Sequence, residues 1–111
     1  MSQPDIHRYF RHGMLPQLRL FEASARLGSF TRAAQELHMA QPTASVQIKK
    51  LSETVGFPLF EYVGRRLHLT EAGRRLHASC EEVFRVFAAL EASLADMRAL
   101  ESAGASAIRA A

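Results

Sequence analysis

The chain has 111 residues, of which 48% are hydrophobic and 23% charged, with a formal net charge of +3. This length suits one compact domain plus one additional element, and no run approaches the roughly 18 apolar residues that a membrane span needs. A single cysteine, Cys80, and five scattered histidines exclude a disulfide framework and a zinc site, so no metal or other cofactor is expected.

The positive charge is concentrated in one part of the chain. Residues 1–75 hold 11 Lys or Arg and 6 Asp or Glu, a net charge of +5, whereas residues 76–111 hold 3 and 5, a net charge of −2. A basic domain is typical of proteins that bind nucleic acid, although a solvated basic face also occurs in other soluble proteins. The N-terminus lacks the apolar run of a signal peptide, which predicts a cytoplasmic protein.

The N-terminal part predicts a leader followed by a helix. Residues 1–14 show no apolar period and contain proline and glycine, so they are expected to form a flexible leader. From Pro16 onward, apolar residues such as Leu18 and Phe21 recur at helical spacing, and Gly28 supplies a C-terminal stop. The first helix is therefore expected between this proline and this glycine.

Two further helices are expected before residue 57. Ser29 or Thr31 can cap a short second helix, after which the chain turns at residues 38–40. A third helix is predicted to begin at Gln41 and to run to Gly56, with one face packed and the polar face free to contact a partner. The packed face holds Ala44, Ile48, Leu51 and Val55.

After the third helix the apolar period changes to that of strands. Two short strands are expected around a basic turn at residues 63–65, which together form a wing. The three helices and this wing are expected to share one core. The residues assigned to that core are Phe21, Leu37, Ile48, Leu51, Phe57, Leu59 and Phe60.

Thr70 is expected to cap a long helix over residues 71–100. A helix of some 30 residues spans roughly 45 Å, longer than any core that the first 70 residues can build, so its apolar seam predicts a homodimer. The alternative is that this helix folds back on its own domain. Residues 101–111 lose the period and are expected to be a disordered tail or a truncation point. The seam residues are Leu76, Cys80, Val83, Phe87, Leu90, Leu94 and Met97.

These elements predict a mainly α fold. Residues 15–70 form a winged helix-turn-helix of three helices and a two-stranded wing, and a long coiled-coil linker helix follows at residues 71–100. Two short helices joined by a tight turn have the geometry that places the second helix in the major groove, which is about 12 Å wide. Cys80 is expected to be a small apolar side chain within the seam.

The stretch LRLFEASARLGSFTRAAQELHMAQPTASVQIKKLSETVGFPLFEYVGRRLHLTEAG closely resembles the LysR-type bacterial transcriptional regulators, and with the linker helix the resemblance covers about residues 15–100. SVQIKKL and the linker helix are similar to the branch that regulates carbon-fixation (Calvin-cycle, Rubisco) operons. The resemblance implies binding to double-stranded operator DNA, antiparallel pairing of linker helices, homodimers and tetrameric full-length regulators. It also implies a two-lobed effector domain, to which no part of these 111 residues corresponds.

Base contacts are expected from the N-terminal half of the third helix. Gln41 can bond a base through two hydrogen bonds, and Pro42 can present an apolar surface to a thymine methyl or can simply begin the helix. Many family members carry Arg at the position of Val46, so a guanine contact is absent there, and Ala40 replaces the usual capping Ser or Thr. The base-contacting candidates are Gln41, Pro42, Thr43, Ser45, Val46 and Lys49.

A second set of residues is expected on the DNA backbone or in the minor groove. Arg65 lies at the wing tip and matches the family residue that enters the minor groove, where narrow A·T-rich tracts attract a guanidinium. Tyr62, where the family often has Arg, is expected to pack on the hairpin. Lys49 and Lys50 on the third helix either contact DNA or are only solvated, as lysines on a helix often are. The set comprises Thr31, Arg32, Lys50, Arg65 and Arg66.

Other functional classes fit the sequence less well. It offers no phosphate-binding glycine loop, metal-ligand spacing or activated nucleophile, so no enzyme is predicted. An RNA-binding role lacks aromatic residues interleaved with the basic surface. The remaining alternative is a coiled-coil protein-interaction adaptor without sequence-specific DNA binding, which salt-dependent binding to duplex DNA would distinguish.

Overall fold

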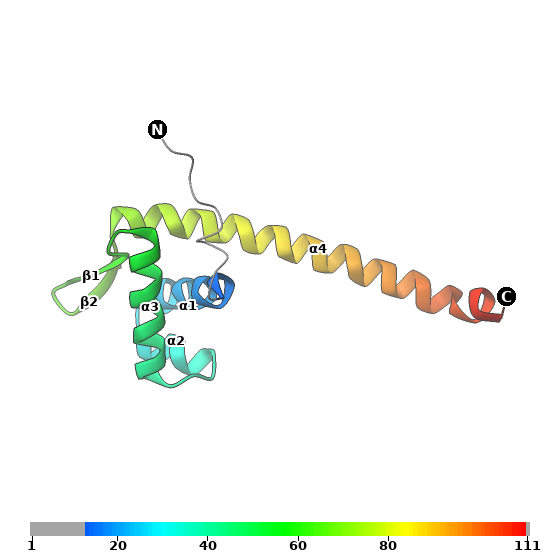
Figure 1. Ribbon diagram of the computed structural model, residues 1–111, viewed down its shortest axis with the longest axis horizontal. Coiled ribbons are helices and arrows are strands. Elements are labelled where there is room, and N and C mark those ends of the chain that lie inside the picture. Colours follow the sequence, from blue (N-terminus) through cyan, green and yellow to red (C-terminus); the bar gives the residue numbers. More distant parts are fainter. Residues whose placement is uncertain (1–12, 111) are drawn as a thin grey trace. The chain divides into compact units, whose positions relative to one another are not determined.

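The computed structural model describes residues 13–110, including the side chains of residues 13–104. The predicted leader at residues 1–14 lies outside the described residues except for its last two positions. The elements are α1 (Met14–Leu27), α2 (Phe30–Glu36), α3 (Gln41–Val55), β1 (Phe60–Val63), β2 (Arg66–Leu69) and α4 (Glu71–Ala110) (Figure 1). The predicted fold class, three helices with a two-stranded wing and a long helix, is confirmed.

The chain divides into two compact units, one that ends at Cys80 and one that begins at Glu81. The first contains α1 to β2 and the start of α4, and the second contains the rest of α4. No helix in the described part of the chain is long and apolar enough to cross a membrane.

Local sequence signals set the ends of the first three helices. Gly28 and Gly56 follow α1 and α3 with φ angles of 65° and 89°, the left-handed conformation that favours glycine. The Oγ of Ser29 accepts a hydrogen bond from the backbone N–H of Arg32 at 3.1 Å. Of the two predicted caps for α2, the structure therefore uses Ser29.

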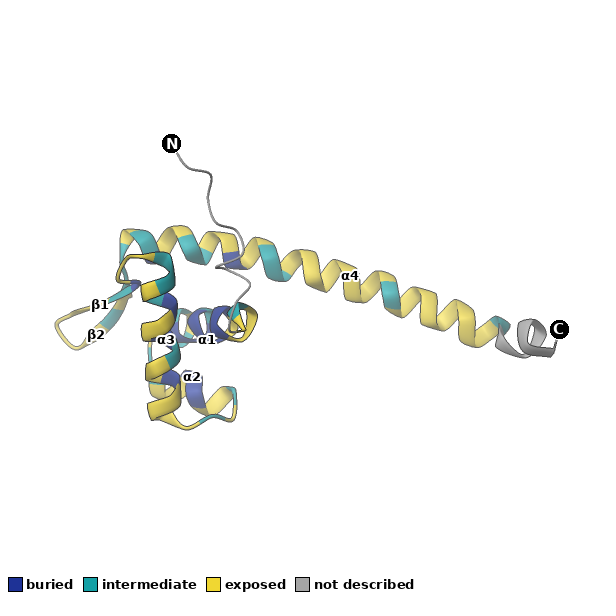
Figure 2. Cartoon of the chain, viewed as in Figure 1, coloured by how far each residue is buried: buried dark blue, intermediate teal, exposed yellow. Residues whose placement is uncertain are grey.

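The core of the first unit lies among α1, α2 and α3 (Figure 2). The ring of Phe60 on the wing lies 5.3 Å from that of Phe21 and 5.0 Å from that of Phe30, so aromatic contacts join the wing to the helices. Of the predicted core, Leu37 and Phe60 are half-buried. The almost fully buried apolar residues include Leu20, Phe21, Ala33, Ala34, Ala44, Leu51 and Leu59.

The prediction that Phe57 belongs to the core is wrong, because this side chain is 62% exposed. It lies in the bend directly after Gly56, before the chain reaches the interior. Leu59, two residues later, fills the interior position with only 1% of its surface exposed. The segment is apolar as expected, but the bend decides which of its side chains is buried.

The wing is an antiparallel hairpin in which Phe60 pairs with Leu69 and Val63 pairs with Arg66. Its turn contains Gly64, whose φ of 64° provides the positive φ that a tight two-residue hairpin turn requires. The predicted two-stranded wing is confirmed, and its turn consists of residues 64 and 65, because Val63 belongs to β1.

The wing and α4 are joined by a tight backbone contact. Thr70 N–H donates to the carbonyl of Leu59 at 3.0 Å, and Thr70 Oγ1 donates to the carbonyl of Pro58 at 2.6 Å. The same Oγ1 accepts from the backbone N–H of Gly73 at 3.0 Å, which confirms Thr70 as the helix cap. A Cβ at position 73 would lie 2.1 Å from the Leu59 carbonyl oxygen. Only glycine fits there.

Helix α4 is longer than predicted, since it continues to Ala110 instead of ending near residue 100. The expectation of a disordered tail is thus wrong for residues 101–110. Loss of the apolar period removes a packing face but not helix propensity, and the segment is rich in alanine and contains no proline.

Gly73→Ala should destabilise the first unit by roughly 3 kcal/mol, because the added Cβ would overlap a backbone carbonyl that Thr70 already holds. Helix propensity alone predicts the opposite sign, a gain of about 0.5–1 kcal/mol. Urea unfolding of both proteins measures the difference. A variant as stable as the parent chain would show that α4 can shift without cost.

Candidate nucleic-acid interface

Helix α3 presents an almost entirely exposed face opposite its buried stripe. Ala44, Ile48 and Leu51 are buried against α1 and α2. Val46, an apolar side chain, is 49% exposed on the outer side. All six predicted base-contacting residues are exposed, as is Lys50, so α3 leaves them available to a partner: Gln41, Pro42, Thr43, Ser45, Val46 and Lys49.

Two of these residues are already arranged with respect to each other. Gln41 Nε2 donates a hydrogen bond to Ser45 Oγ at 3.0 Å, and both side chains are exposed. The bond leaves the Gln41 oxygen and its second N–H, together with the Ser45 hydroxyl hydrogen, for other partners. The pair therefore offers acceptors and donors side by side in the first turns of α3, as recognition of a base edge requires.

The N-terminus of α3 has no side-chain cap, as the alanine at position 40 predicts. The first N–H groups of a helix have no partner within the helix and carry a partial positive charge. Thr31 and Arg32 are exposed at the start of the neighbouring helix α2. These groups suit contacts with phosphate oxygens.

The orientation of α3 depends on a polar contact that the sequence analysis missed. Gln17 of α1 is 6% exposed, and its Nε2 donates to Gln47 Oε1 of α3 at 2.9 Å. The bond fixes how α3 is rotated on α1 and hence which side chains face outward. A glutamine among the apolar positions of α1 was the signal that could have revealed it.

Charged contacts hold α2 in place on the outside. The Arg26 guanidinium at the end of α1 donates to both Glu22 and Glu36. The hydrogen bonds from Arg26 lower the pKa of the Glu36 carboxyl, and those from Arg74 and Arg75 lower the pKa of Glu71 at the start of α4. The carboxyl side chains of Glu36 and Glu71 are 41% and 63% exposed, so solvent screens these ion pairs and their contribution to stability is small.

The wing carries its predicted cations, but one of its aromatic residues differs from expectation. Arg65 lies in the turn and Arg66 at the start of β2, and both are exposed. Tyr62 does not pack away on the hairpin, since it is 66% exposed. It instead lines a groove between the wing and α3.

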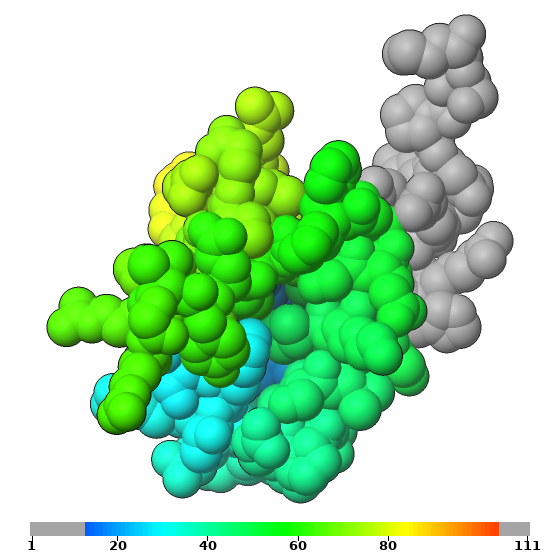
Figure 3. Space-filling model, turned by 90° about the vertical axis from the view of Figure 1, so that its left-hand side faces the viewer, coloured from blue at the N-terminus to red at the C-terminus, as the bar shows by residue number. Residues whose placement is uncertain are grey.

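That groove has a volume of about 600 Å³. Figure 3 shows it as a hollow bordered by the wing, the start of α2 and the outer side of α3. The base-contacting candidate Lys49 lies on its rim. The groove therefore borders one base-contacting candidate, Lys49 of α3, and the strand β1 that leads to the wing turn with Arg65.

Cys80 cannot contribute to a seam with a partner chain as predicted, because it is 1% exposed within this single chain. Burial, with a smaller effect from the charge of Glu22, raises the pKa of its thiol to about 11. The ring of His77, one turn earlier, lies 6.2 Å from that of Phe21. The first turns of α4 thus pack on α1, as expected if this part of the helix folds back on its own domain.

The remaining seam residues differ in exposure. Leu76 is half-buried in the first unit. In the second unit Val83 and Leu94 are half-buried, whereas Phe87, Leu90 and Met97 are 46%, 47% and 61% exposed. An apolar stripe therefore stays uncovered along α4 in the second unit. Groups of acidic, histidine or cysteine side chains able to hold a metal ion do not occur among the described residues.

Comparison with known proteins gives consistent results. The family described as bacterial regulatory helix-turn-helix protein, lysR family, matches residues 15–74. The chain is 47% identical over 73 residues to a RuBisCO operon transcriptional regulator of Acidithiobacillus ferrooxidans, covering 66% of this chain and 24% of that protein. It is 48% identical over 86 residues to a protein of the same name from Allochromatium vinosum, covering 78% and 26%. The chain thus spans about a quarter of the length of these relatives.

Solved structures agree with the fold. The DNA-binding domain of BenM in complex with catB site 1 DNA is 30% identical, with a TM-score of 0.70 over 75% of this chain and 92% of that one. The CbnR DNA-binding domain in complex with DNA is 28% identical, with a TM-score of 0.64 over 76% and 95%.

The burial of Cys80 predicts low thiol reactivity. At pH 9 an exposed thiol with a pKa near 8.5 is mostly thiolate, whereas a pKa of about 11 leaves about 1% as thiolate. Iodoacetamide at pH 9 should therefore modify the native chain much more slowly than the urea-unfolded chain, as mass spectrometry can follow. Equal rates would contradict the packing of α4 on α1.

Proposed function

The chain belongs to the lysR family of bacterial regulatory helix-turn-helix proteins, and on this premise we propose that it binds double-stranded DNA sequence-specifically as the DNA-binding part of a transcriptional regulator. The observation that carries the proposal is the exposed face of α3. A helix of this kind fits the major groove, and its first turns meet the base edges.

Within that face each residue type has a distinct role. Gln41 and Ser45 contact base edges through the donors and acceptors that their mutual hydrogen bond leaves free. Val46, which is 49% exposed, offers its methyl groups to a thymine methyl, together with Pro42. Thr43 and Lys49 complete the base-contacting set.

The surrounding residues position the domain on the duplex. Arg65 at the wing tip enters the minor groove, whose narrow A·T-rich tracts attract an arginine. Arg66, Lys50 and the start of α2, with Thr31 and Arg32, contact phosphates. The exposure of these side chains and the uncapped α3 terminus support these assignments.

Regulation of a carbon-fixation operon is the finer proposal. It is supported by the names of the relatives from Acidithiobacillus ferrooxidans and Allochromatium vinosum, both called RuBisCO operon transcriptional regulators. CmpR of Synechocystis, called a transcriptional activator, is 40% identical over 91 residues. The regulator as a whole would add an effector domain outside these 111 residues.

Dimerisation through α4 is part of the same proposal. The uncovered stripe of the second unit, with Phe87, Leu90 and Met97, would otherwise face water. The two recognition helices of one dimer would bind two half-sites. These half-sites are separated by about one helical turn of DNA or by a multiple of one turn. Higher oligomers are proposed for the full-length regulator.

Gln41→Ala should weaken binding to the specific operator by roughly ten- to a hundred-fold, since a glutamine contact with a base contributes about 1–3 kcal/mol of discrimination. Binding to a scrambled duplex should change little. Lys50→Ala is the matched control. It should weaken binding to both duplexes and reduce the slope of log K against log salt concentration by about one.

The measurement is a fluorescence-anisotropy titration of both variants on both duplexes at several salt concentrations, with promoter fragments of a RuBisCO operon as the first operators to test. An equal loss on both duplexes for Gln41→Ala would remove this residue from base recognition. A parent chain that binds no duplex in a salt-dependent manner would favour a protein-interaction adaptor instead.

Replacing both Phe87 and Leu90 with Asp should convert dimers into monomers at micromolar concentration, because two carboxylates would then face the apolar partner stripe. Sedimentation equilibrium measures the mass. The exposed Val86, outside the predicted seam, provides the control, and its replacement by Asp should leave the dimer intact. A dimeric double variant would show that the stripe is not the interface.

A further inference from the structure

The side-chain amide of Gln47 on α3 is oriented by a buried residue of α1. Gln17, which is 6% exposed, donates from its Nε2 to Gln47 Oε1 at 2.9 Å. Because the Gln47 oxygen accepts this bond, the amide nitrogen of Gln47 is turned away from Gln17. This half-buried side chain forms no other hydrogen bond with the residues that the structure describes. Gln47 therefore has N–H donors available for a partner outside this unit.

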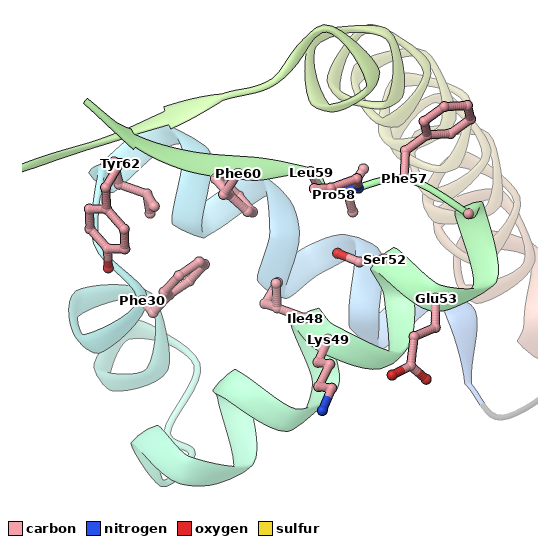
Figure 4. A pocket seen from close by; sticks show the side chains of 12 residues that line it. Phe30, Ile48, Lys49, Ser52, Glu53, Phe57, Pro58, Leu59, Phe60 and Tyr62 are labelled. Atoms are coloured by element: carbon pink, nitrogen blue, oxygen red, sulfur yellow. The ribbon is translucent and has the colours of Figure 1, made fainter.

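Gln47 lies on the flank of α3 that is turned away from the wing. Thr43, Gln47 and Lys50 follow one another at spacings of four and three residues, so they share one side of the helix. Thr43 and Lys50 are exposed there. The residues of α3 on the wing-facing flank, which line the groove toward the wing, include Lys49, Ser52 and Glu53 (Figure 4).

The flank with Gln47 faces a DNA strand in the proposed complex. A helix that occupies the major groove, about 12 Å wide, has a sugar–phosphate strand along each of its two sides. The wing-facing flank of α3 meets one strand, so the flank with Gln47 meets the other. Phosphate oxygens only accept hydrogen bonds, and an amide nitrogen only donates them. The donors of Gln47 therefore match the phosphates of that second strand.

We propose that Gln47 donates a hydrogen bond to a phosphate of the strand on the side of α3 away from the wing, and that Gln17 is the positioning residue that turns the Gln47 nitrogen outward. The proposal rests on the proposed function and adds a phosphate contact that no charged side chain makes. An amide held in place before binding loses less conformational entropy than a free one. The opposite amide orientation would turn the Gln47 oxygen toward the phosphate and repel it.

Two substitutions of Gln47 separate this contact from a purely structural role. Gln47→Glu keeps an oxygen that accepts from Gln17 but places a carboxylate where the donor was, whereas Gln47→Met leaves the buried Gln17 amide without its partner. Urea unfolding should therefore find Gln47→Glu close to the parent chain and Gln47→Met less stable. Affinity for DNA should follow the reverse order, with losses of roughly ten-fold for Gln47→Met and roughly thirty-fold for Gln47→Glu.

The losses should be equal on operator and scrambled duplex, because a phosphate contact carries no sequence information. Gln47→Met should leave the slope of log K against log salt concentration unchanged, since a neutral side chain releases no counterion, whereas Lys50→Ala reduces this slope by about one. Both quantities come from fluorescence-anisotropy titrations at several salt concentrations.

Gln17→Met tests the positioning role. It should lower the affinity for both duplexes by roughly three-fold, because the Gln47 amide is then free to rotate. When Gln47 is already methionine, adding Gln17→Met should cause no further loss of affinity. Additive losses, or a loss of preference for the operator, would show instead that Gln17 only supports the packing of α3, and would overturn its positioning role.

A last measurement locates the phosphate. Operators with one uncharged methylphosphonate linkage, placed in turn along both strands, are titrated with the parent chain and the Gln47 variants. The loss from Gln47→Met should disappear at one or two neighbouring linkages of one strand, and the same linkages should relieve the larger loss from Gln47→Glu. Ser79→Glu, on the exposed side of α4 in the same unit, adds the same charge as a control. It should cause less than half of the Gln47→Glu loss, and no single linkage should relieve it.

The Gln47 contact is overturned if Gln47→Met binds both duplexes as the parent chain does, if its loss is confined to the operator, or if no linkage removes the loss. A loss confined to the operator would mean that Gln47 contacts a base. In each of these cases a parent chain that still prefers operator over scrambled duplex leaves the proposed function standing.

Discussion

The arrangement of this protein depends on the contact between the Leu59 carbonyl, Thr70 and Gly73. The carbonyl accepts from Thr70 N–H at 3.0 Å, and the helix passes so close that a Cβ at position 73 would lie 2.1 Å from the same oxygen. Both ends of the hairpin are thereby fixed to the first turn of α4. Because backbone atoms cannot rotate away as side chains do, this contact sets where the wing begins.

The surface proposed to bind DNA follows from how the helices are anchored beneath it. The Gln17–Gln47 bond and the buried apolar stripe of α3 fix the rotation of that helix, while the Phe21, Phe30 and Phe60 rings tie the wing to α1 and α2. Rigid support of this kind lowers the entropic cost of ordering the contacting side chains on binding. The exposed residues can therefore vary without loss of the geometry.

The positive charge of the first 75 residues surrounds candidates for base recognition that are themselves neutral. Residues 1–75 carry a net charge of +5, whereas Gln41, Ser45 and Val46 on the exposed face of α3 are uncharged. A purely cationic surface would bind any duplex, since phosphate contacts carry no sequence information. In the proposed complex, these neutral side chains of α3 leave discrimination between sequences to hydrogen bonds and methyl contacts.

The sequence by itself determined the order and type of the elements, because glycines, caps and apolar periods are local signals. Gly28, Gly56 and Thr70 marked helix ends that the structure confirms. The tertiary structure alone decided which apolar residues are covered: Phe57 is exposed in its bend, and Cys80 is buried against α1 although it fits a heptad seam. Periodicity shows that a helix face is apolar but not what packs on it, since a seam serves its own domain and a partner equally well. The Gln17–Gln47 bond and the groove at Glu53 join residues distant in sequence, and only folding brings them together.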